Sequence, residues 1–372
     1  MIYFFSFLIS ISFMKVAYNN ADKKKVAAFF LTLSAATLVL LASCRSENIG
    51  VDVIVYQKPY FLMANKYSSV FSYVLSPATK LEPIYLVVTY LASKMGSLFW
   101  LFFLCESILC TFIYLTIWYY RAMIPPHLSL ACYLFIYYCM GFPGIRQHIS
   151  IAIIMYAVTH LERKNYLITV FLTLMAMGFH NSAIIIGIAI FGLYILSVSK
   201  LNKFWVVVVM LTLFFVSTNF VEIVERVGKI FPGLLKKYIR QYLHLRLGRD
   251  LNMSSTLLVI TGIIILILVY LTGDTIKDMN YLFLMYMMIF SLSGGFIGLY
   301  SPQLQRIIWN CQTYIIFIIP HGFRLLYKSR ASIFIAYAAF YSSLMGYFVF
   351  QYVIKTVYEV YPYELAIGIT LF

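Results

Sequence analysis

The chain has 372 residues, of which 63% are hydrophobic and only 11% are charged, and its formal net charge is +15. This composition excludes a soluble domain of this size and favours a polytopic helical membrane protein. The positive charge then lies mostly in loops beside anionic lipid, and we expect membrane lipid, not nucleic acid, as a partner.

Apolar stretches of about membrane-spanning length recur along the whole chain. We predict a single all-α membrane domain over residues 1–372, with about twelve spans and a range of about 10 to 14. The first span lacks a basic leader and a small-residue cleavage site, so we expect it to be retained. The expected spans are 2–18, 26–43, 97–120, 128–141, 145–161, 165–179, 181–198, 203–220, 254–273, 280–300, 303–320 and 331–352.

Two long connections interrupt this pattern. Residues 44–96 contain a short apolar piece, 83–94, which is too short to cross easily and is expected to be re-entrant or interfacial. Residues 221–253 combine lysine and arginine with leucine and tyrosine at helical spacing, which predicts an amphipathic surface helix. That helix either adheres to anionic lipid or covers a site for an anionic lipid-linked substrate.

Basic residues in the short loops indicate the orientation of the chain. With Met1 outside, loops that contain residues such as Lys23, Arg121, Arg163 and Lys200 all fall on the cytoplasmic side. This is the distribution that the positive-inside rule requires. Both long connections then lie on the outer side of the membrane.

The run Gly-Phe-Pro-Gly-Ile-Arg-Gln-His, residues 141–148, places Arg146 and Gln147 at the start of an expected helix. An ionisable group at such a place is a functional hypothesis, because burial of charge in hydrocarbon is costly. A helix N-terminus also favours anions such as phosphate. The alternative is an interfacial arginine that reaches the lipid headgroups.

Other polar residues also fall at the outer ends of spans. Arginines beside a carboxylate and a histidine suit transfer chemistry at a diphosphate leaving group. A carboxylate or a neutral imidazole can take the proton from an attacking hydroxyl. Each member also has a structural alternative, as an ion pair, a helix cap or a helix start. The proposed diphosphate ligands are Arg45, Tyr56, Arg146, Gln147 and Arg306, and the proposed catalytic residues are Asp52, Glu82 and His180.

Among the catalytic candidates we assign the general base to His180, with Asp52 as its rival. An unperturbed imidazole titrates near pH 6.5, which makes it a usable base at neutral pH. A carboxylate would need its pKa raised by burial, and neighbouring arginines oppose that change. The sequence has no metal-binding motif, no phosphate loop and no serine nucleophile elbow, so we expect no metal or cofactor. The six cysteines form no metal or redox pair.

Several of these residues, in this order, resemble the O-antigen polymerase family, and within it the Wzy-like exopolysaccharide polymerases of the EpsG type. The similar segments are Arg45…Gly50-Val-Asp52…Tyr56, Glu82-Pro83-Ile-Tyr85, Ile145-Arg146-Gln147, Phe179-His180-Asn-Ser182-Ala183 and Tyr361-Pro362-Tyr363. They extend over residues 45–363. The region before Arg306 departs from the family pattern.

The resemblance implies a metal-independent, GT-C-like membrane glycosyltransferase of the bacterial cytoplasmic (inner) membrane. Such enzymes join oligosaccharide repeat units carried on undecaprenyl diphosphate at the outer or periplasmic face, for lipopolysaccharide or exopolysaccharide. A chain-length regulator and a flippase are the implied protein partners.

Three other functions compete with a polymerase. A flippase for lipid-linked oligosaccharide would need ionisable residues deep along a central path, and only Glu106 is clearly deep. An O-acyltransferase would take its acyl donor from the cytoplasm and would need a histidine with a partner residue near that side. The histidines expected there have no convincing partner. A structural scaffold is the third alternative.

Overall fold

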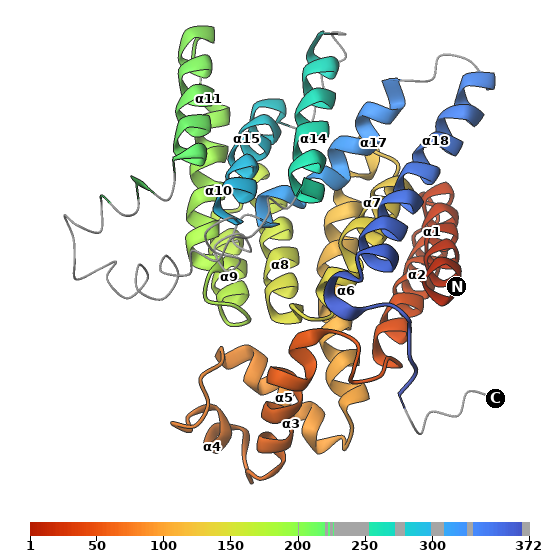
Figure 1. The fold of residues 1–372 in the computed structure, drawn as a ribbon, viewed down its shortest axis with the longest axis vertical. Coiled ribbons are helices and arrows are strands. Elements are labelled where there is room, and N and C mark those ends of the chain that lie inside the picture. The colour runs from red at the N-terminus through yellow and green to blue at the C-terminus, as the bar shows by residue number, and fades with distance from the viewer. Residues whose placement is uncertain are drawn as a thin grey trace. The chain divides into compact units, whose positions relative to one another are not determined.

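The computed structural model describes residues 1–199, 201–219, 253–271, 280–298, 309–325 and 330–366, together with residues 222, 223 and 226. The described residues form helices joined by short loops, and they contain no β-strand (Figure 1). An isolated antiparallel bridge joins Arg45 to Leu365. The all-helical class predicted from the sequence is therefore confirmed.

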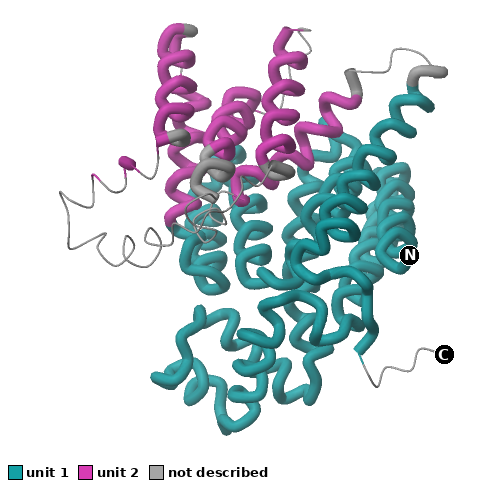
Figure 2. Tube along the Cα trace, in the orientation of Figure 1, with its two compact units in different colours: residues 1–184, 329–372 teal, residues 185–328 magenta. Residues whose placement is uncertain are grey.

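The chain divides into two compact units (Figure 2). Unit 1 contains residues Met1–Ile184 and Ser329–Phe372, and unit 2 contains Ile185–Lys328. The expectation of a single domain over residues 1–372 stays a prediction.

Unit 1 is built around long apolar helices. Helix α1 packs on α2 and α7, α6 packs on α2 and α8, α8 packs on α9, and α7 packs on α18. Almost every residue of α8 is buried, which explains how this helix can carry polar side chains. The helices are α1 Ile2–Asn19, α2 Lys24–Ser43, α6 Leu98–Tyr119, α7 Pro126–Ile136, α8 Ile145–Glu162, α9 Tyr166–Met177 and α18 Arg330–Phe348. Shorter 3₁₀ or π turns are η2 Tyr120–Ala122, η3 Tyr138–Gly141, η5 Val349–Ile354 and η6 Val357–Glu359.

A small helical module follows α2 in unit 1. It consists of the π-helical turn η1 Val53–Gln57 and of the helices α3 Lys58–Asn65, α4 Val70–Val74 and α5 Pro83–Lys94. Ala64, Tyr73 and Leu86 form its core. The Tyr73 hydroxyl donates to the carbonyl of Tyr60 at 3.0 Å, so the core ties α4 to α3. The apolar piece 83–94 predicted from the sequence coincides with α5.

Unit 2 also consists of apolar helices. Helix α15 packs on both α11 and α14, and α14 packs on α17. The Asn280 side chain donates to the Ser197 hydroxyl at 2.7 Å and links the start of α15 to α10. The helices are α10 Ala183–Val198, α11 Lys203–Thr218, α14 Met253–Leu271, α15 Tyr281–Gly298 and α17 Ile315–Leu325.

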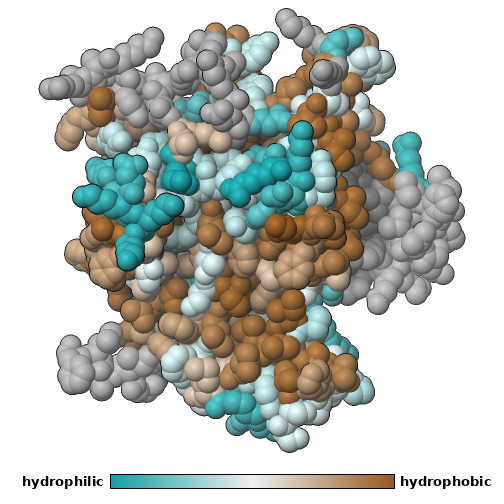
Figure 3. Space-filling model, turned by 180° about the vertical axis from the view of Figure 1, so that it is seen from behind, coloured by the Kyte–Doolittle hydropathy of each residue, from teal (hydrophilic) through white to brown (hydrophobic). Residues whose placement is uncertain are grey.

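Four helical segments of the described chain are long and apolar enough to cross a membrane: Ile2–Asn19, Lys24–Ser43, Leu98–Ala122 and Ile333–Ile354. Six shorter apolar helices accompany them. In the back view of Figure 3, brown hydrophobic side chains cover much of the visible face, and hydrophilic patches lie among them.

One predicted span differs from the structure, and one predicted helix stays a prediction. The expected span 303–320 is interrupted by a turn at 313–314, and α17 begins only at Ile315 and continues past Pro320. The amphipathic helix expected within residues 221–253 lies almost entirely outside the described residues.

Candidate functional site

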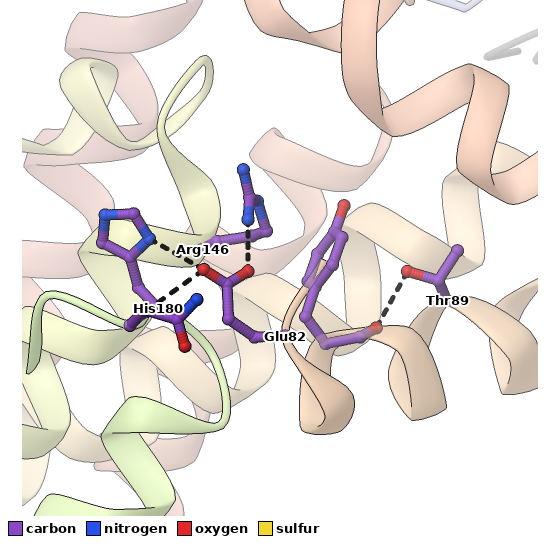
Figure 4. A network of polar contacts seen from close by, with 6 residues as sticks. Glu82, Thr89, Arg146 and His180 are labelled. Carbon is purple, nitrogen blue, oxygen red and sulfur yellow. Dashed lines mark hydrogen bonds and ion pairs between the residues drawn. The ribbon is translucent and has the colours of Figure 1, made fainter. Parts of the chain in front are cut away.

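The carboxylate of Glu82 is the centre of a polar cluster in unit 1. One carboxylate oxygen, Oε2, accepts a hydrogen bond from Nη1 of Arg146. The other, Oε1, lies 3.2 Å from Nδ1 of His180 and accepts a bond of 3.2 Å from the backbone N–H of Asn181. Figure 4 shows the arginine and the imidazole converging on this carboxylate. Three segments that are remote in the sequence therefore meet at one side chain.

Local sequence explains why Glu82 holds this position. Glu82 is the N-cap of α5 and has an extended backbone, and Pro83 occupies the first turn of the helix, where a missing N–H costs nothing. The carbonyl of Gly178 accepts bonds from the N–H groups of Ile84 and Tyr85, at 2.9 and 3.2 Å. These bonds fix the start of α5 against the end of α9.

Gly178 lies where α9 closely approaches α5. A Cβ atom added at Gly178 would lie 2.4 Å from Cδ1 and 3.1 Å from Cβ of Ile84, so the Ile84 side chain would have to shift. Gly178 is the C-cap of α9, and the chain turns there so that His180 faces Glu82. The Gly-Phe-His segment thus delivers the imidazole because its glycine has no side chain.

Arg146 reaches the cluster from the first turn of α8, which begins at Ile145. Its guanidinium carbon also lies 5.5 Å from the centre of the Tyr85 ring. Tyr85 and Glu82 share the beginning of α5, so α5 provides both the carboxylate and an aromatic wall for the arginine.

The cluster holds Glu82 in its ionised form. Burial raises the pKa of this carboxyl group, but the hydrogen bond with His180 and the charge of Arg146 more than offset that effect. The pKa of Glu82 falls to about 2. An ionised carboxylate can only accept hydrogen bonds, so Nδ1 of His180 must carry the hydrogen in this contact.

This arrangement leaves two reactive groups open to a substrate. The Glu82 side chain is only 5% exposed, whereas those of Arg146 and His180 are 24% and 29% exposed. With Nδ1 occupied by Glu82, Nε2 of a neutral His180 is the atom able to accept a proton. Arg146 keeps further N–H groups for an anion.

Arg45 lies elsewhere and is almost fully buried. Its guanidinium group is placed between the rings of Phe102 and Phe142, at 3.9 and 4.3 Å from their centres. Nη1 donates to the carbonyl of Ala42 at 2.7 Å, and the charge of Glu106 is close enough to interact with it. With 1% of its surface exposed, Arg45 contacts protein rather than an open site.

Asp52, Tyr56 and Gln147 lie outside the contacts of Glu82 described above. Asp52 precedes η1, and Tyr56 is exposed on that turn. Gln147 follows Arg146 on α8 and is buried. Arg306 lies outside the described residues.

Two contributors to the region were not anticipated. The backbone N–H of Asn181 binds Glu82, and a backbone contact of this kind leaves no signal in side-chain identity. Gln57 binds the turn that precedes α8. Its only signal in the sequence was its place one residue after Tyr56. The described residues contain no group of three or more His, Cys, Asp or Glu side chains that could hold a metal ion.

Comparison with known protein families identifies a match over nearly the whole chain. The model of the EpsG family matches residues 28–365, and this range includes Glu82, Arg146 and His180. No curated protein and no solved structure matches the chain.

Proposed function

The chain belongs to the EpsG family, and from this premise we propose that it joins oligosaccharide repeat units carried on undecaprenyl diphosphate. Membership of the family makes it a membrane protein of the polysaccharide polymerase type. The carrier lipid, the chemistry and the side of the membrane are our proposal. The observation that carries the proposal is the pairing of one buried carboxylate, Glu82, with both His180 and Arg146.

In the proposed reaction a sugar hydroxyl of the acceptor unit attacks the anomeric carbon of the donor chain. A carbon–oxygen bond forms there while the bond between that carbon and the diphosphate oxygen breaks. Nε2 of His180 takes the hydroxyl proton, and Glu82 stabilises the imidazolium that results. Undecaprenyl diphosphate leaves with the electron pair of the broken bond.

Arg146 is proposed to bind the departing diphosphate. A planar guanidinium group can offer paired N–H bonds to phosphate oxygens, and the N-terminus of α8 adds positive dipole charge. These interactions strengthen as negative charge develops on the leaving group, so they lower the barrier rather than only bind substrate. We propose that no metal takes part, as for a GT-C-like enzyme.

We further propose that the site faces outward from the bacterial cytoplasmic membrane, in a protein of about twelve spans. The loops after α1 and α8, at the ends of these helices opposite the site, contain Lys23, Arg163 and Lys164. Positive charge in short loops favours the cytoplasm. The end of unit 1 that carries Glu82 would then be outside.

A flippase for lipid-linked oligosaccharide is the second function considered from the sequence. The family match does not favour it. The two functions differ in their products, because a polymerase makes new glycosidic bonds and a flippase only moves intact molecules. The deciding test is whether purified protein converts lipid-linked repeat units into longer chains.

A further inference from the structure

We propose that Gln57 is a positioning residue for Arg146. Together with Gly50, it holds the turn Phe142-Pro143-Gly144, from which α8 begins. This inference rests on the proposed function, since it explains how the arginine assigned to the diphosphate is kept in place.

The side-chain amide of Gln57 makes the first contact with this turn. Its Nε2 group donates to the carbonyls of Phe142 and Pro143, at 3.2 and 3.5 Å. Gln57 is 3% exposed, so these bonds form where water does not compete. The carbonyls of a buried turn need such donors, and an aliphatic side chain at this position would leave both without them.

Gly50 makes the second contact, directly between backbones. Its φ is +96°, a region that favours glycine. A Cβ atom added there would lie 3.1 Å from the carbonyl carbon of Phe142 and 3.1 Å from the nitrogen of Pro143. The loop that contains Gly50 therefore touches the turn, and a side chain there would push the backbone of the turn by a few tenths of an ångström.

Arg45 supports the same turn from a third direction, since its guanidinium lies over the Phe142 ring. Arg45, Gly50 and Gln57 all belong to one segment that follows α2. All three contacts with the turn therefore come from one segment. In this role Arg45 supports the turn and does not touch the substrate.

These contacts with the turn affect the geometry of the ion pair between Arg146 and Glu82. Arg146 is two residues beyond Gly144, so any shift of the turn moves its guanidinium group. Glu82 is fixed independently, by the contact of α5 with Gly178. A displacement of about 1 Å can lower the rate of an enzyme by about 100-fold. Gln57 would thus affect catalysis without contacting the substrate.

Two glycines allow a matched experiment. Gly50 and Gly96 have nearly equal positive φ values, +96° and +93°, but a Cβ atom at Gly96 meets nothing within 4 Å. Gly50→Ala and Gly96→Ala therefore impose similar backbone strain. We expect both to lower Tm, and only Gly50→Ala to lower kcat by about tenfold or more. Equal kcat for the two variants would contradict the proposal.

A double-mutant cycle between Gln57→Leu and Arg146→Ala gives the second test. If Gln57 acts through Arg146, the double variant should have about the same kcat as Arg146→Ala alone. The decrease in Tm of the double variant should also be smaller than the sum of the decreases in the two single variants. Tyr73→Phe is the control, because it removes one partly buried hydrogen bond of the same module away from the turn. It is expected to leave kcat unchanged.

Additive effects of Gln57→Leu and Arg146→Ala on Tm would overturn the positioning role. The Tm cycle needs no substrate, so it decides this inference even if the wild-type protein makes no polymer. An absence of polymer from the wild-type protein would instead overturn the proposed function. The two failures are therefore distinguishable.

Discussion

Nδ1 of His180 lies 3.2 Å from Oε1 of Glu82, although 98 residues separate the two in the chain. The contact fixes the tautomer of the imidazole and directs Nε2 away from the carboxylate. A buried, ionised partner of this kind is what a histidine needs to act as a base and to remain stable once protonated. Arg146 shares the same carboxylate, through its other oxygen.

His180→Ala is expected to lower kcat by about 10²–10⁴ while the KM for the lipid-linked donor changes little, because only proton transfer is lost. Steady-state kinetics of the purified variant would measure both constants, and added imidazole should restore part of the rate. Near-normal turnover by a stable variant would remove His180 from the mechanism. If Asp52→Asn were then inactive but still bound donor, Asp52 would become the base.

Glu82→Gln is expected to lower stability in a pH-dependent way. The pKa of Glu82 falls to about 2 in the folded protein, from an ordinary value near 4.5. The ionised carboxylate therefore stabilises the fold fully above about pH 4.5, and this stabilisation is lost as the pH falls towards 2. We expect the difference in unfolding free energy between wild type and variant to be constant above about pH 5 and to shrink below it.

Glu47→Gln is the control for this titration. Glu47 pairs with Lys58 at 2.7 Å, but their side chains are 40% and 38% exposed, compared with 5% for Glu82. An exposed pair contributes little to stability, so its removal should change the unfolding free energy much less. Equal pH profiles for the two variants, measured by chemical unfolding in detergent, would contradict the role of the buried cluster.

Arg146→Ala is expected to remove about 2–4 kcal/mol of transition-state stabilisation, seen as a loss of kcat/KM. Arg146→Lys should restore little, because an ammonium group cannot replace a planar fork. Arg121 offers a matched control in η2, directly after the end of α6 that is remote from the site. Like Arg146, Arg121 lies over an aromatic ring, that of Trp118. The Arg121→Ala variant should make polymer of normal length. Normal polymer length in an Arg146→Ala strain would refute the diphosphate assignment.

The orientation of the chain can be read by cysteine labelling. Five of the six native cysteines are buried, so a Cys44→Ser background is sufficient. Ala78 and Asp22 are exposed, and unit 1 places them at opposite ends of its helices. In intact spheroplasts an impermeant maleimide should label Ala78→Cys and should label Asp22→Cys only after permeabilisation. The reverse pattern would place the site in the cytoplasm.

Much of the fold was predictable because long apolar runs have few alternatives in a membrane. The predicted span 2–18 became Ile2–Asn19, and 145–161 became Ile145–Glu162. Helices α3 and α4 were not predicted, because short helices with a small tyrosine-rich core have no long apolar period. The expected span 303–320 was interrupted, since an apolar run does not reveal a turn within it.

The sequence predicted which residues belong to the site but not the contacts between them. Glu82, Arg146 and His180 were all selected from the sequence as polar groups at the ends of spans, but their shared carboxylate is a tertiary contact. Arg45 shows the limit of this reasoning, because a buried arginine between two rings and an open arginine look the same in a sequence. Packing decides between them.

The most direct test of the proposed function is incubation of the purified protein with lipid-linked repeat units, with and without EDTA, followed by gel analysis of the products. We predict a ladder of chains with wild-type protein in both conditions, and none above background with His180→Ala. Unchanged repeat units with the wild type, or their transfer across a vesicle membrane without new glycosidic bonds, would contradict the polymerase assignment. A ladder that EDTA abolishes would contradict the metal-free mechanism alone.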